Sequence, residues 1–462
     1  MGSGNSYKKL VSTTMILAIG SFSSKVLVFF LMPFYTRVLS PTEYGTVNLI
    51  VQASNLLIPL ASAGIINSVI RFGLEKDSNK SAVFTTGIFT VLGGFAILCC
   101  FGPLLNLLDA INGYTVLVLV YVLMSAFHSV CAQFVQAKKY TKLYALDGVL
   151  RTIMTIGLNI LFLVTFDMGI TGYVLATVVS DFLSTIFLWF IASLGRYFHI
   201  SSMNRHTTAT MLKYSIPLIP TMVCTWVISM SDQFMIEYFI DEAATGIYSV
   251  SNKVPHILSI AASIFGDAWQ ISIVSEDREK QRKFFSDVFA TYQCIALLGA
   301  SGLIMCAKII VMVLASKPYY TAWEYIPFLV LGTMFSCLGT FLGSIYMVEK
   351  QSIYTLLTMA AGAVTNVVLN LIFIPIIGVM GAAAATMVSY FLMFLLRGIH
   401  TRRFIPVRWH LPKFLLSALL VCCQAALILA GAPFWPLWEI LLFLGVLALN
   451  CKELLRSLFR LF

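Results

Sequence analysis

The sequence predicts an all-α polytopic membrane protein of about 14 transmembrane helices, arranged as two parallel six-helix lobes plus two C-terminal helices. Hydrophobic residues make up 59% of the chain and charged residues 11%, whereas about 25% of the residues of a globular domain are charged. The mean hydropathy is +0.90. Apolar runs recur along the whole chain between short polar turns, and most have the roughly 20 residues that a bilayer-spanning helix needs.

Six apolar runs precede a basic connection at 196–213, six follow it, and two more close the chain, with the turn near Gly378 as the weakest separator. This order predicts an N-lobe over 1–200, a C-lobe over 201–400 and two additional helices over 401–462, with the connection as a cytoplasmic linker between the lobes. We expect transmembrane helices near 10–38, 44–72, 82–108, 114–137, 143–166, 169–195, 214–239, 243–273, 284–314, 322–348, 352–376, 379–399, 411–431 and 435–456.

The basic residues indicate the orientation of these helices. Of the 30 Lys and Arg, 24 lie on the side of the two termini, 2 (Arg37 and Lys317) lie on the opposite side and 4 lie within spans. Cytoplasmic loops carry an excess of Lys and Arg. The sequence therefore predicts a multi-pass protein of the cell membrane with both termini in the cytoplasm.

An internal repeat relates the two predicted lobes. The stretch 25–45 is echoed by 234–248, with Gly246 in the place of Gly45. Because each half has an even number of spans, both halves enter the membrane from the same side and the repeat is parallel. Four positions of the fifth and sixth spans, Asn159, Gly172, Thr177 and Ser180, match Asn370, Gly381, Thr386 and Ser389 in the second half.

Several function classes are excluded by what the sequence lacks. No Gly-x-x-x-x-Gly-Lys-[Ser/Thr] motif occurs, and the predicted loops are too short to hold a nucleotide-binding module. The net charge of +10 comes from short basic clusters between apolar runs, which is the pattern of cytoplasmic loops and not of a nucleic-acid interface. The ten cysteines lie in or beside apolar runs without a metal-ligand spacing. We expect no cofactor, no metal site and no nucleic-acid partner.

Polar residues form a stripe along the fifth predicted span. Asp147, Arg151, Thr155 and Asn159 recur every four residues and so share one helix face. Two interpretations remain open at this point. The stripe lines a polar cavity, or Asp147 and Arg151 neutralise each other as an ion pair four residues apart.

A longer stripe marks the eighth predicted span. Its members share one helix face, which is typical of the wall of a wet cavity, and Lys253 lies beside them. The second span carries Gln52 and Asn55 at corresponding places of the repeat. The predicted cavity lining is therefore Gln52, Asn55, Asn252, His256, Ser259 and Ser263, with Asp267 at the end of the longer stripe.

Carboxylates within spans are candidates for proton or cation coupling, because a charge inside the bilayer is costly unless it has a function or a partner. Three residues qualify: Asp181, Asp232 and Asp267. Asp232 could instead be solvated near the outer interface. Pro217 and Pro220 open the seventh span and free backbone carbonyls there. They predict a bend, which serves either as a gate or as a static kink.

Three motifs carry a resemblance to a known family. They are Arg37-Val-Leu-Ser-Pro-Thr-Glu-Tyr-Gly45 after the first span, Ser215-Ile-Pro-Leu-Ile-Pro220 at the start of the second lobe, and Asp232 ahead of a short acidic turn that ends in Gly246. The chain resembles the bacterial polysaccharide (Wzx-like) flippases of the multidrug/oligosaccharidyl-lipid/polysaccharide exporter superfamily.

This resemblance implies a non-enzymatic flippase that works by alternating access. Its substrate would be an undecaprenyl-diphosphate-linked oligosaccharide, moved from the inner to the outer leaflet for capsule, O-antigen or exopolysaccharide assembly. Partners would be membrane lipids and a polysaccharide polymerase. The resemblance further implies a cationic central cavity, and the residues that can supply it and hold the diphosphate are Lys25, Lys253, Arg71 and Arg151.

Three other functions are compatible with a chain of this kind. A lipid II flippase also recognises a diphosphate. A multidrug or cation antiporter of the same superfamily would more naturally use unpaired carboxylates. An integral-membrane glycosyltransferase or polymerase would need a sizeable external loop for its acceptor, and the predicted external loops are only a few residues long.

Overall fold

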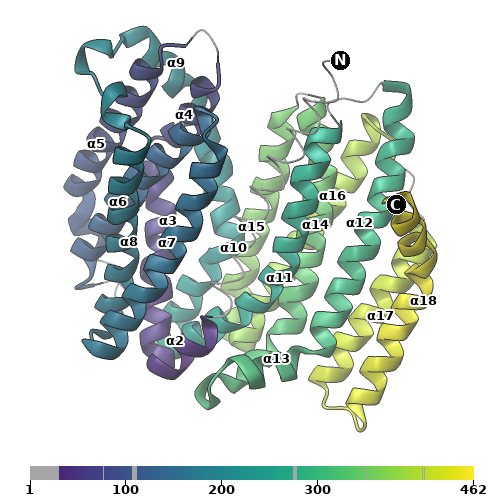
Figure 1. Ribbon diagram of the computed structural model, residues 1–462. Helices are drawn as coiled ribbons and strands as arrows, with labels where there is room; N and C mark the ends of the chain where they lie inside the picture. The colour runs from purple at the N-terminus through teal and green to yellow at the C-terminus, as the bar shows by residue number, and fades with distance from the viewer. Residues whose placement is uncertain are drawn as a thin grey trace. The chain divides into compact units, whose positions relative to one another are not determined.

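The computed structural model describes residues 31–75, 78–106, 112–273, 278–349, 351–407, 409 and 411–461 (Figure 1). Within these ranges it describes the backbone alone at 104, 263–273, 278–284, 287, 347, 352 and 452–461. The chain divides into two compact units, Met1–Val223 and Cys224–Phe462.

The first unit is a bundle of helices. In chain order its described elements are α2 (Met32–Val38), α3 (Pro41–Ala61), α4 (Ile65–Gly73), α5 (Lys80–Leu105), α6 (Thr115–Ala137), α7 (Thr141–Ile160) with its π-helical continuation η2 (Leu161–Thr165), α8 (Gly169–Ile191), the 3-10 turns η3 (Leu194–Tyr197) and η4 (Ile200–Ser202), α9 (Arg205–Ser215), the 3-10 turn η5 (Ile216–Leu218) and the start of α10 (Ile219–Phe239).

The turn between α2 and α3 is built by the motif that opens the chain's repeat. Ser40 is the N-cap of α3 and Pro41 follows at its first position. The backbone N–H of Ser40 donates to Glu43 Oε2 at 2.9 Å, and the N–H of Glu43 donates to Ser40 Oγ at 3.3 Å. This capping box satisfies two N–H groups that the helix start would otherwise leave unpaired.

The predicted second span is broken. α3 and α4 meet at an angle of 58°, and the break lies at Ala63 and Gly64, which both have positive φ. A Cβ at Gly94 of α5 would lie 1.6 Å from the backbone oxygen of Ala61. A glycine is therefore required where α5 passes the end of α3.

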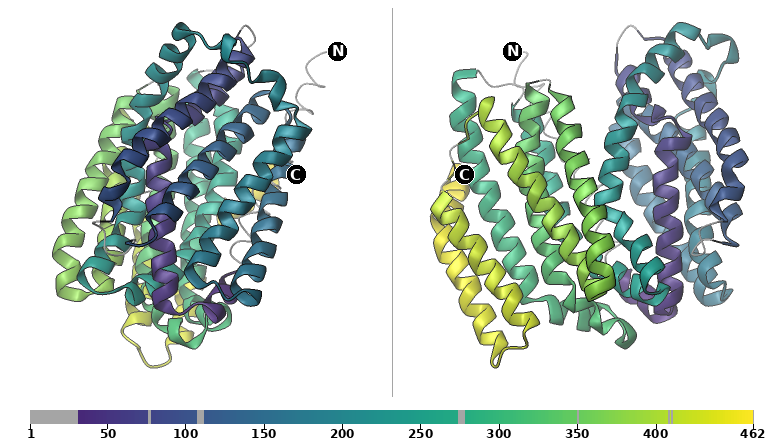
Figure 2. Two further views of the ribbon diagram at one scale, coloured as in Figure 1. Left: turned by 90° about the vertical axis from the view of Figure 1, so that its left-hand side faces the viewer. Right: turned by 180° about the vertical axis from the view of Figure 1, so that it is seen from behind.

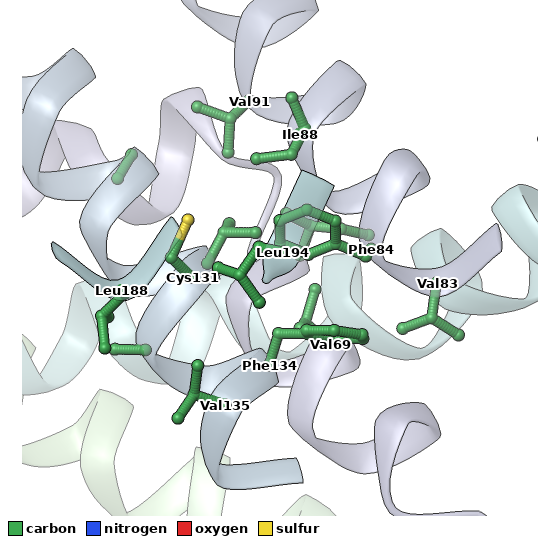
Figure 3. Close-up of a cluster of buried hydrophobic side chains, with 14 of the residues drawn as sticks. Val69, Val83, Phe84, Ile88, Val91, Cys131, Phe134, Val135, Leu188 and Leu194 are labelled. Atoms are coloured by element: carbon green, nitrogen blue, oxygen red, sulfur yellow. The ribbon is translucent and has the colours of Figure 1, made fainter. Parts of the chain in front are cut away.

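The apolar core of the first unit gathers α4, α5, α6 and α8 (Figure 3). Val69, Phe84 and Phe134 are buried at its centre, and the rings of Phe84 and Phe134 lie 4.7 Å apart. Leu194 of η3 and Met211 of α9 belong to the same cluster and are completely buried. The segment 196–213, predicted as a linker between the lobes, thus packs against the core of the first unit, and its role as a cytoplasmic connection stays a prediction.

The second unit contains the remaining helices. They are the rest of α10, α11 (Glu242–Ile273), α12 (Arg278–Met305), α13 (Ala307–Leu314), the 3-10 helix η6 (Lys317–Glu324), α14 (Ile326–Val348), α15 (Ser352–Ile377), α16 (Val379–His400), the 3-10 turn η7 (Thr401–Arg403), α17 (Leu411–Leu429) and α18 (Trp435–Leu461). The turn expected near Gly378 is confirmed: Gly378 separates α15 from α16 with a φ of 64°.

Small residues on α14 allow α16 to approach closely. A Cβ at Gly332 would lie 3.2 Å from Cα of Met387, and one at Gly339 would lie 3.4 Å from Cα of Phe394. Small residues at such contacts are a common way for membrane helices to pack, since lipid provides no hydrophobic drive between them. The final pair, α17 and α18, packs against α12 (Figure 2).

The described residues confirm the fold class. Ten described helices are long and apolar enough to cross a membrane, or eleven if the bent α3–α4 pair is one span. α11 and α18 match two further predicted spans, and of the first predicted span only Met32–Val38 is described as α2. α9, η5 and α10 form one continuous stretch over Arg205–Phe239, so the helix tightens near Pro217 without a break. A gating role for Pro217 and Pro220 remains a prediction.

Two helix pairs use the same contact at matching repeat positions. A Cβ at Gly172 of α8 would lie 3.2 Å from the backbone oxygen of Phe162, and one at Gly381 of α16 would lie 2.5 Å from that of Phe373. Asn159 and Asn370 are both buried, and each has a side-chain oxygen without a hydrogen-bond partner among the described residues. These parallels support the internal repeat.

Candidate functional site

The polar stripe of α7 is divided between two buried clusters. Asp147 does not pair with Arg151. Its Oδ2 lies 2.9 Å from His128 Nε2 of α6, and its Oδ1 accepts a hydrogen bond from Ser184 of α8. The ion-pair interpretation of the stripe is therefore wrong. The packing of α6 and α8 against α7 places His128 and Ser184 beside Asp147, so Asp147 hydrogen-bonds to them and not to Arg151.

Arg151 pairs instead with Asp181 of α8. Its Nε donates to Asp181 Oδ1, while Ser125 of α6 donates to Asp181 Oδ2. The carboxylate is completely buried, whereas 37% of the Arg151 side chain is exposed. Both oxygens of Asp181 are satisfied, but the Nη groups of Arg151 have no partner among the described residues. The pair thus orients the guanidinium and leaves its outer edge open.

The backbone beside Arg151 is also fixed. Ser180 Oγ donates to the carbonyl oxygen of Arg151 at 2.9 Å, and Thr155 Oγ1 donates to Ser180 Oγ at 2.8 Å. These bonds join α7 to α8 beside the ion pair. Arg151 is therefore held in position from both its backbone and its side chain.

A second buried cluster lies in the second unit around Asp232. The carboxylate is 1% exposed, so the alternative of a solvated Asp232 near the interface is wrong. Asp232 Oδ2 accepts hydrogen bonds from Tyr248 Oη of α11 at 2.5 Å and from Thr386 Oγ1 of α16 at 2.7 Å. The other oxygen, Oδ1, is buried without a hydrogen-bond partner among the described residues.

The Asp232 cluster continues into α15. Asn366 Nδ2 donates to Thr386 Oγ1 at 3.2 Å, and Asn370 Nδ2 donates to Asn366 Oδ1 at 3.1 Å. In the described part of the second unit no cation pairs with Asp232. A buried carboxylate surrounded only by neutral donors can accept a proton or a small cation in place of the missing counter-charge.

The cavity stripe predicted on α11 is described only in part. Asn252, Lys253 and Ser259 are half-buried and His256 is exposed, while the side chains of Ser263 and Asp267 lie outside the described residues. Asn252 Nδ2 donates to the backbone oxygen of Tyr248 at 3.2 Å. Lys253 forms no ion pair with any side chain that the structure describes.

The remaining predicted residues differ in their surroundings. On α3, Asn55 Nδ2 donates to Gln52 Oε1 at 3.4 Å. Arg71 pairs with Glu75 at 3.1 Å just beyond the end of α4, and the two side chains are 56% and 42% exposed. Arg71 is thus partly neutralised on the surface. Lys25 lies outside the described residues.

The profile of the family described as "Polysaccharide biosynthesis protein" matches residues 34–324. The chain belongs to this family. No curated protein sequence matches the chain significantly. The resemblance to polysaccharide exporters is thereby confirmed at the level of the family.

Solved structures of low sequence identity share the fold. The lipid II flippase MurJ in an inward closed conformation has 16% identity and a TM-score of 0.75, covering 96% of this chain and 100% of its own. An inward-facing multidrug resistance MATE family transporter of the MOP superfamily has 14% identity and a TM-score of 0.65, covering 82% and 95%. The MATE multidrug transporter DinF-BH has 15% identity and a TM-score of 0.65, covering 87% and 97%.

Several residues of the buried clusters around Arg151 and Asp232 were not predicted from the sequence. Ser125 is one of them, and its place one turn from His128 on α6 is a spacing that indicates a shared face. His128 itself is the hydrogen-bonded core residue that a single histidine within a span predicts. Tyr248 precedes Asn252 by four residues and so extends the α11 stripe. Thr386 was visible as a repeat match, but its role depends on the contact between α10 and α16, which no pattern along one helix reveals.

One buried cation was also placed wrongly. Arg397 is one of the 24 basic residues assigned to the side of the termini, but it is 3% exposed within α16. Its Nε donates to Thr358 Oγ1 and its Nη1 to the carbonyl oxygen of Gly339, both at 3.0 Å. A Cβ at Gly343 would lie 2.7 Å from Nη1. Arg397 therefore links α14, α15 and α16 internally.

Proposed function

We propose that the protein is a flippase that moves an undecaprenyl-diphosphate-linked oligosaccharide repeat unit from the inner to the outer leaflet of the cell membrane. The product would serve capsule, O-antigen or exopolysaccharide assembly, and the transport would proceed by alternating access. The observation that carries this proposal is membership of the polysaccharide biosynthesis protein family on a fold shared with the lipid II flippase MurJ.

The diphosphate is the part of such a substrate that most needs protein contacts. Its charges lose hydration inside the membrane, which is costly unless cationic donors replace the water. Charge-assisted hydrogen bonds are roughly twice as strong as neutral ones. We assign this role to Lys253, Arg151 and Lys25. Arg71 is the weakest of the four predicted cations, because Glu75 already pairs with it.

Arg151 is suited to a phosphate because Asp181 occupies its Nε and leaves the Nη groups open. A guanidinium can donate two parallel hydrogen bonds to a phosphate, which a lysine ammonium cannot. Asp181 is therefore better explained as the residue that positions Arg151 than as an ion-coupling site.

Asp232 is the stronger candidate for ion coupling. Its Oδ1 is buried without a partner among the described residues, and its other contacts come from neutral donors. We propose that Asp232 takes up the proton or small cation whose gradient drives transport. Asp267 is a further candidate whose side chain lies outside the described residues.

A lipid II flippase is the second candidate function. The likeness to MurJ over 96% of this chain favours it, and lipid II also carries a diphosphate. Two host strains separate the candidates. The gene should restore export in a strain that lacks its polysaccharide flippase, whereas rescue of a strain depleted of its lipid II flippase would favour the second candidate.

Variants in the first strain test the cation assignment. Lys253→Ala should abolish export of the glycan while protein level and membrane insertion stay normal, and Lys253→Arg should retain more activity than Lys253→Gln because the charge is kept. Lys317→Ala, a loss of an exposed lysine elsewhere, is the matched control and should leave export unchanged. Normal export by the Lys25→Ala, Lys253→Ala double variant would overturn the assignment.

The coupling assignment has its own test. Asp232→Asn keeps the size of the side chain but removes the charge, so export should become independent of the driving ion and fall at least tenfold. Asp241→Asn is the control, because Asp241 is an exposed residue that caps α11 through the N–H of Ala244. Unchanged export and ion dependence in Asp232→Asn would exclude Asp232.

A further inference from the structure

Residues 194–215 form a cationic segment at one end of the first unit. The segment comprises η3, η4 and α9. No Asp or Glu occurs between Asp181 and Asp232, while Arg196, Arg205 and Lys213 lie within this acid-free stretch. Every Asp, Glu, Lys or Arg between residues 182 and 231 is therefore basic, within the segment and in the stretches on either side of it.

The segment is firmly attached to α4 and α5. Thr85 Oγ1 donates to the carbonyl oxygen of Tyr197 at 3.2 Å and accepts the N–H of His199 at 3.1 Å. Thr86 and Thr208 hydroxyls lie 3.3 Å apart, so consecutive residues of α5 hold both η3 and α9. Ser68 Oγ of α4 donates to the carbonyl oxygen of Met211 at 2.7 Å. Figure 1 shows α9 beside α4 at this end of the unit.

The residues that flank the segment are apolar and exposed. Phe190 and Ile191 at the end of α8 are 74% and 62% exposed, and Ile216 before α10 is 51% exposed. In a membrane protein such apolar side chains face lipid. Between them, Ile200 and Met203 of the η4 region are 65% and 47% exposed. We expect these apolar side chains to face acyl chains close to the head groups, because the flanking residues end predicted spans.

A cation–π contact joins the start of this segment to the connection between α6 and α7. Lys138 Nζ, in the turn between α6 and α7, lies 4.7 Å from the centroid of the Tyr197 ring in η3. Lys139 in the same turn and Lys142 at the start of α7 are exposed, as are Arg196 and Arg205. We call Lys138, Lys139, Lys142, Arg196 and Arg205 the basic patch. None of the five pairs with an acidic side chain that the structure describes.

We propose that the basic patch binds the head groups of anionic phospholipids in the leaflet that it faces. Basic residues beside membrane spans attract anionic lipids on the cytoplasmic side, and the positive-inside pattern assigns the patch to that side. The long side chains extend toward phosphate oxygens while their stems lie along apolar surface. The exposed Ile200 and Met203 fit the acyl chains of the same lipids.

Lipid binding here would stabilise the start of α10. The segment continues directly into α10 through Ser215 and η5. A Cβ at Gly64 would lie 3.0 Å from the carbonyl oxygen of Ser215. The break between α3 and α4 therefore packs against Ser215 at the end of the segment. Lipids that hold the segment in place therefore hold both helix junctions.

The test measures the melting temperature of the full-length protein in a neutral detergent with added lipid. Phosphatidylglycerol should raise the melting temperature more than phosphatidylcholine. The Arg196→Gln, Arg205→Gln double variant should lose at least half of this difference, because both side chains are exposed and their loss leaves the packing intact. The lysine versions, Arg196→Lys and Arg205→Lys, should keep it.

The Arg37→Gln, Lys317→Gln double variant is the matched control, since it removes the same charge from residues on the opposite predicted side. It should keep the full difference. Inorganic diphosphate, added without lipid, should give no shift. A full phosphatidylglycerol shift in Arg196→Gln, Arg205→Gln, or a diphosphate shift equal to that of the lipid, would overturn the proposal.

Discussion

Asp181 and Asp232 are both buried, but their surroundings differ. Asp181 has an arginine on one oxygen and a serine on the other, so its charge is compensated. Asp232 has only hydroxyl donors, on a single oxygen, among the described residues. Sequence reasoning grouped both as ion-coupling candidates because both are carboxylates within spans. The difference depends on neighbouring helices, which spacing along one helix cannot reveal.

The same limit explains the stripe on α7. The four-residue spacing correctly predicts that Asp147, Arg151 and Asn159 share a face. It does not predict their partners, because contacts from α6 and α8 compete with the contact along the helix. His128 pairs with one acid and Arg151 with the other. The spacing of charged residues along one helix therefore predicts which residues share a face better than it predicts which residues form an ion pair.

Removing Arg151 should destabilise the protein. Arg151→Ala leaves the carboxylate of Asp181 buried without a counter-charge, and breaking a fully buried pair costs about 3–5 kcal/mol. We expect about 2–3 kcal/mol here, because the Arg151 side chain is partly exposed. Thermal unfolding in detergent measures the loss as a lower melting temperature.

The double variant Arg151→Ala, Asp181→Asn provides the control. It removes both charges and should recover at least half of the lost stability. If Arg151→Ala unfolds at the temperature of the unchanged protein, or if the double variant is no more stable than the single one, the pair does not have the structural role described.

Among the elements, the helix order was predictable and the helix breaks were not. Apolar runs of the required length identify spans directly, and the turn at Gly378 was found from its glycine. The break between α3 and α4 lies within an apolar run, at Ala63 and Gly64. Its signal is weak, because an isolated glycine is compatible with a continuous helix.

The segment 194–215 shows a second limit at this scale. Its polarity and its position between apolar runs predicted a linker. Leu194 and Met211 nevertheless fill the core between α4, α5 and α6. A few buried apolar residues decide how a short polar segment packs. They hardly change the average polarity of the segment, so its composition does not reveal them.

Neighbouring glycines on α5 provide a controlled test of the α3–α5 contact. Gly94→Ala would place a Cβ 1.6 Å from the backbone oxygen of Ala61, so one of the two helices must shift. Overpacking typically costs about 1–3 kcal/mol, and we expect the upper end because the contact atom belongs to the backbone. The melting temperature in detergent should fall accordingly.

Gly93→Ala is the matched variant, since a Cβ at Gly93 has nothing within 4 Å. It should be neutral or slightly stabilising, because alanine favours a helix over glycine by about 1 kcal/mol. Equal melting temperatures for Gly93→Ala and Gly94→Ala would show that α5 does not pass the end of α3 as closely as described.

At the scale of the whole molecule, the orientation in the membrane remains a prediction from charge. The separation of 24 from 2 basic residues depends on the count of spans, and the described helices agree with that count from the second span onward. We expect residues 75–80, 138–142, 276–283 and 402–408 to face the cytoplasm. The two lobes of the parallel repeat are likewise supported by matching contacts in each unit.

Cysteine labelling in a cysteine-free background tests this orientation. Tyr140 and Lys317 are exposed and lie on opposite predicted sides. Lys317→Cys should react with an impermeant maleimide in intact cells, and Tyr140→Cys should react only after the cells are opened. Labelling of Tyr140→Cys in intact cells would reverse the predicted orientation of the first unit.

We propose that this protein moves a lipid-diphosphate-linked oligosaccharide across the bilayer. The most direct measurement reconstitutes the purified protein into vesicles that contain an undecaprenyl-diphosphate-linked oligosaccharide and follows the fraction of glycan accessible to an external glycosidase over time. We predict that the protected pool becomes accessible with the unchanged protein and at least tenfold more slowly with the Lys25→Ala, Lys253→Ala variant. A protected pool that stays at the level of protein-free vesicles, under each ion gradient applied, would contradict the account.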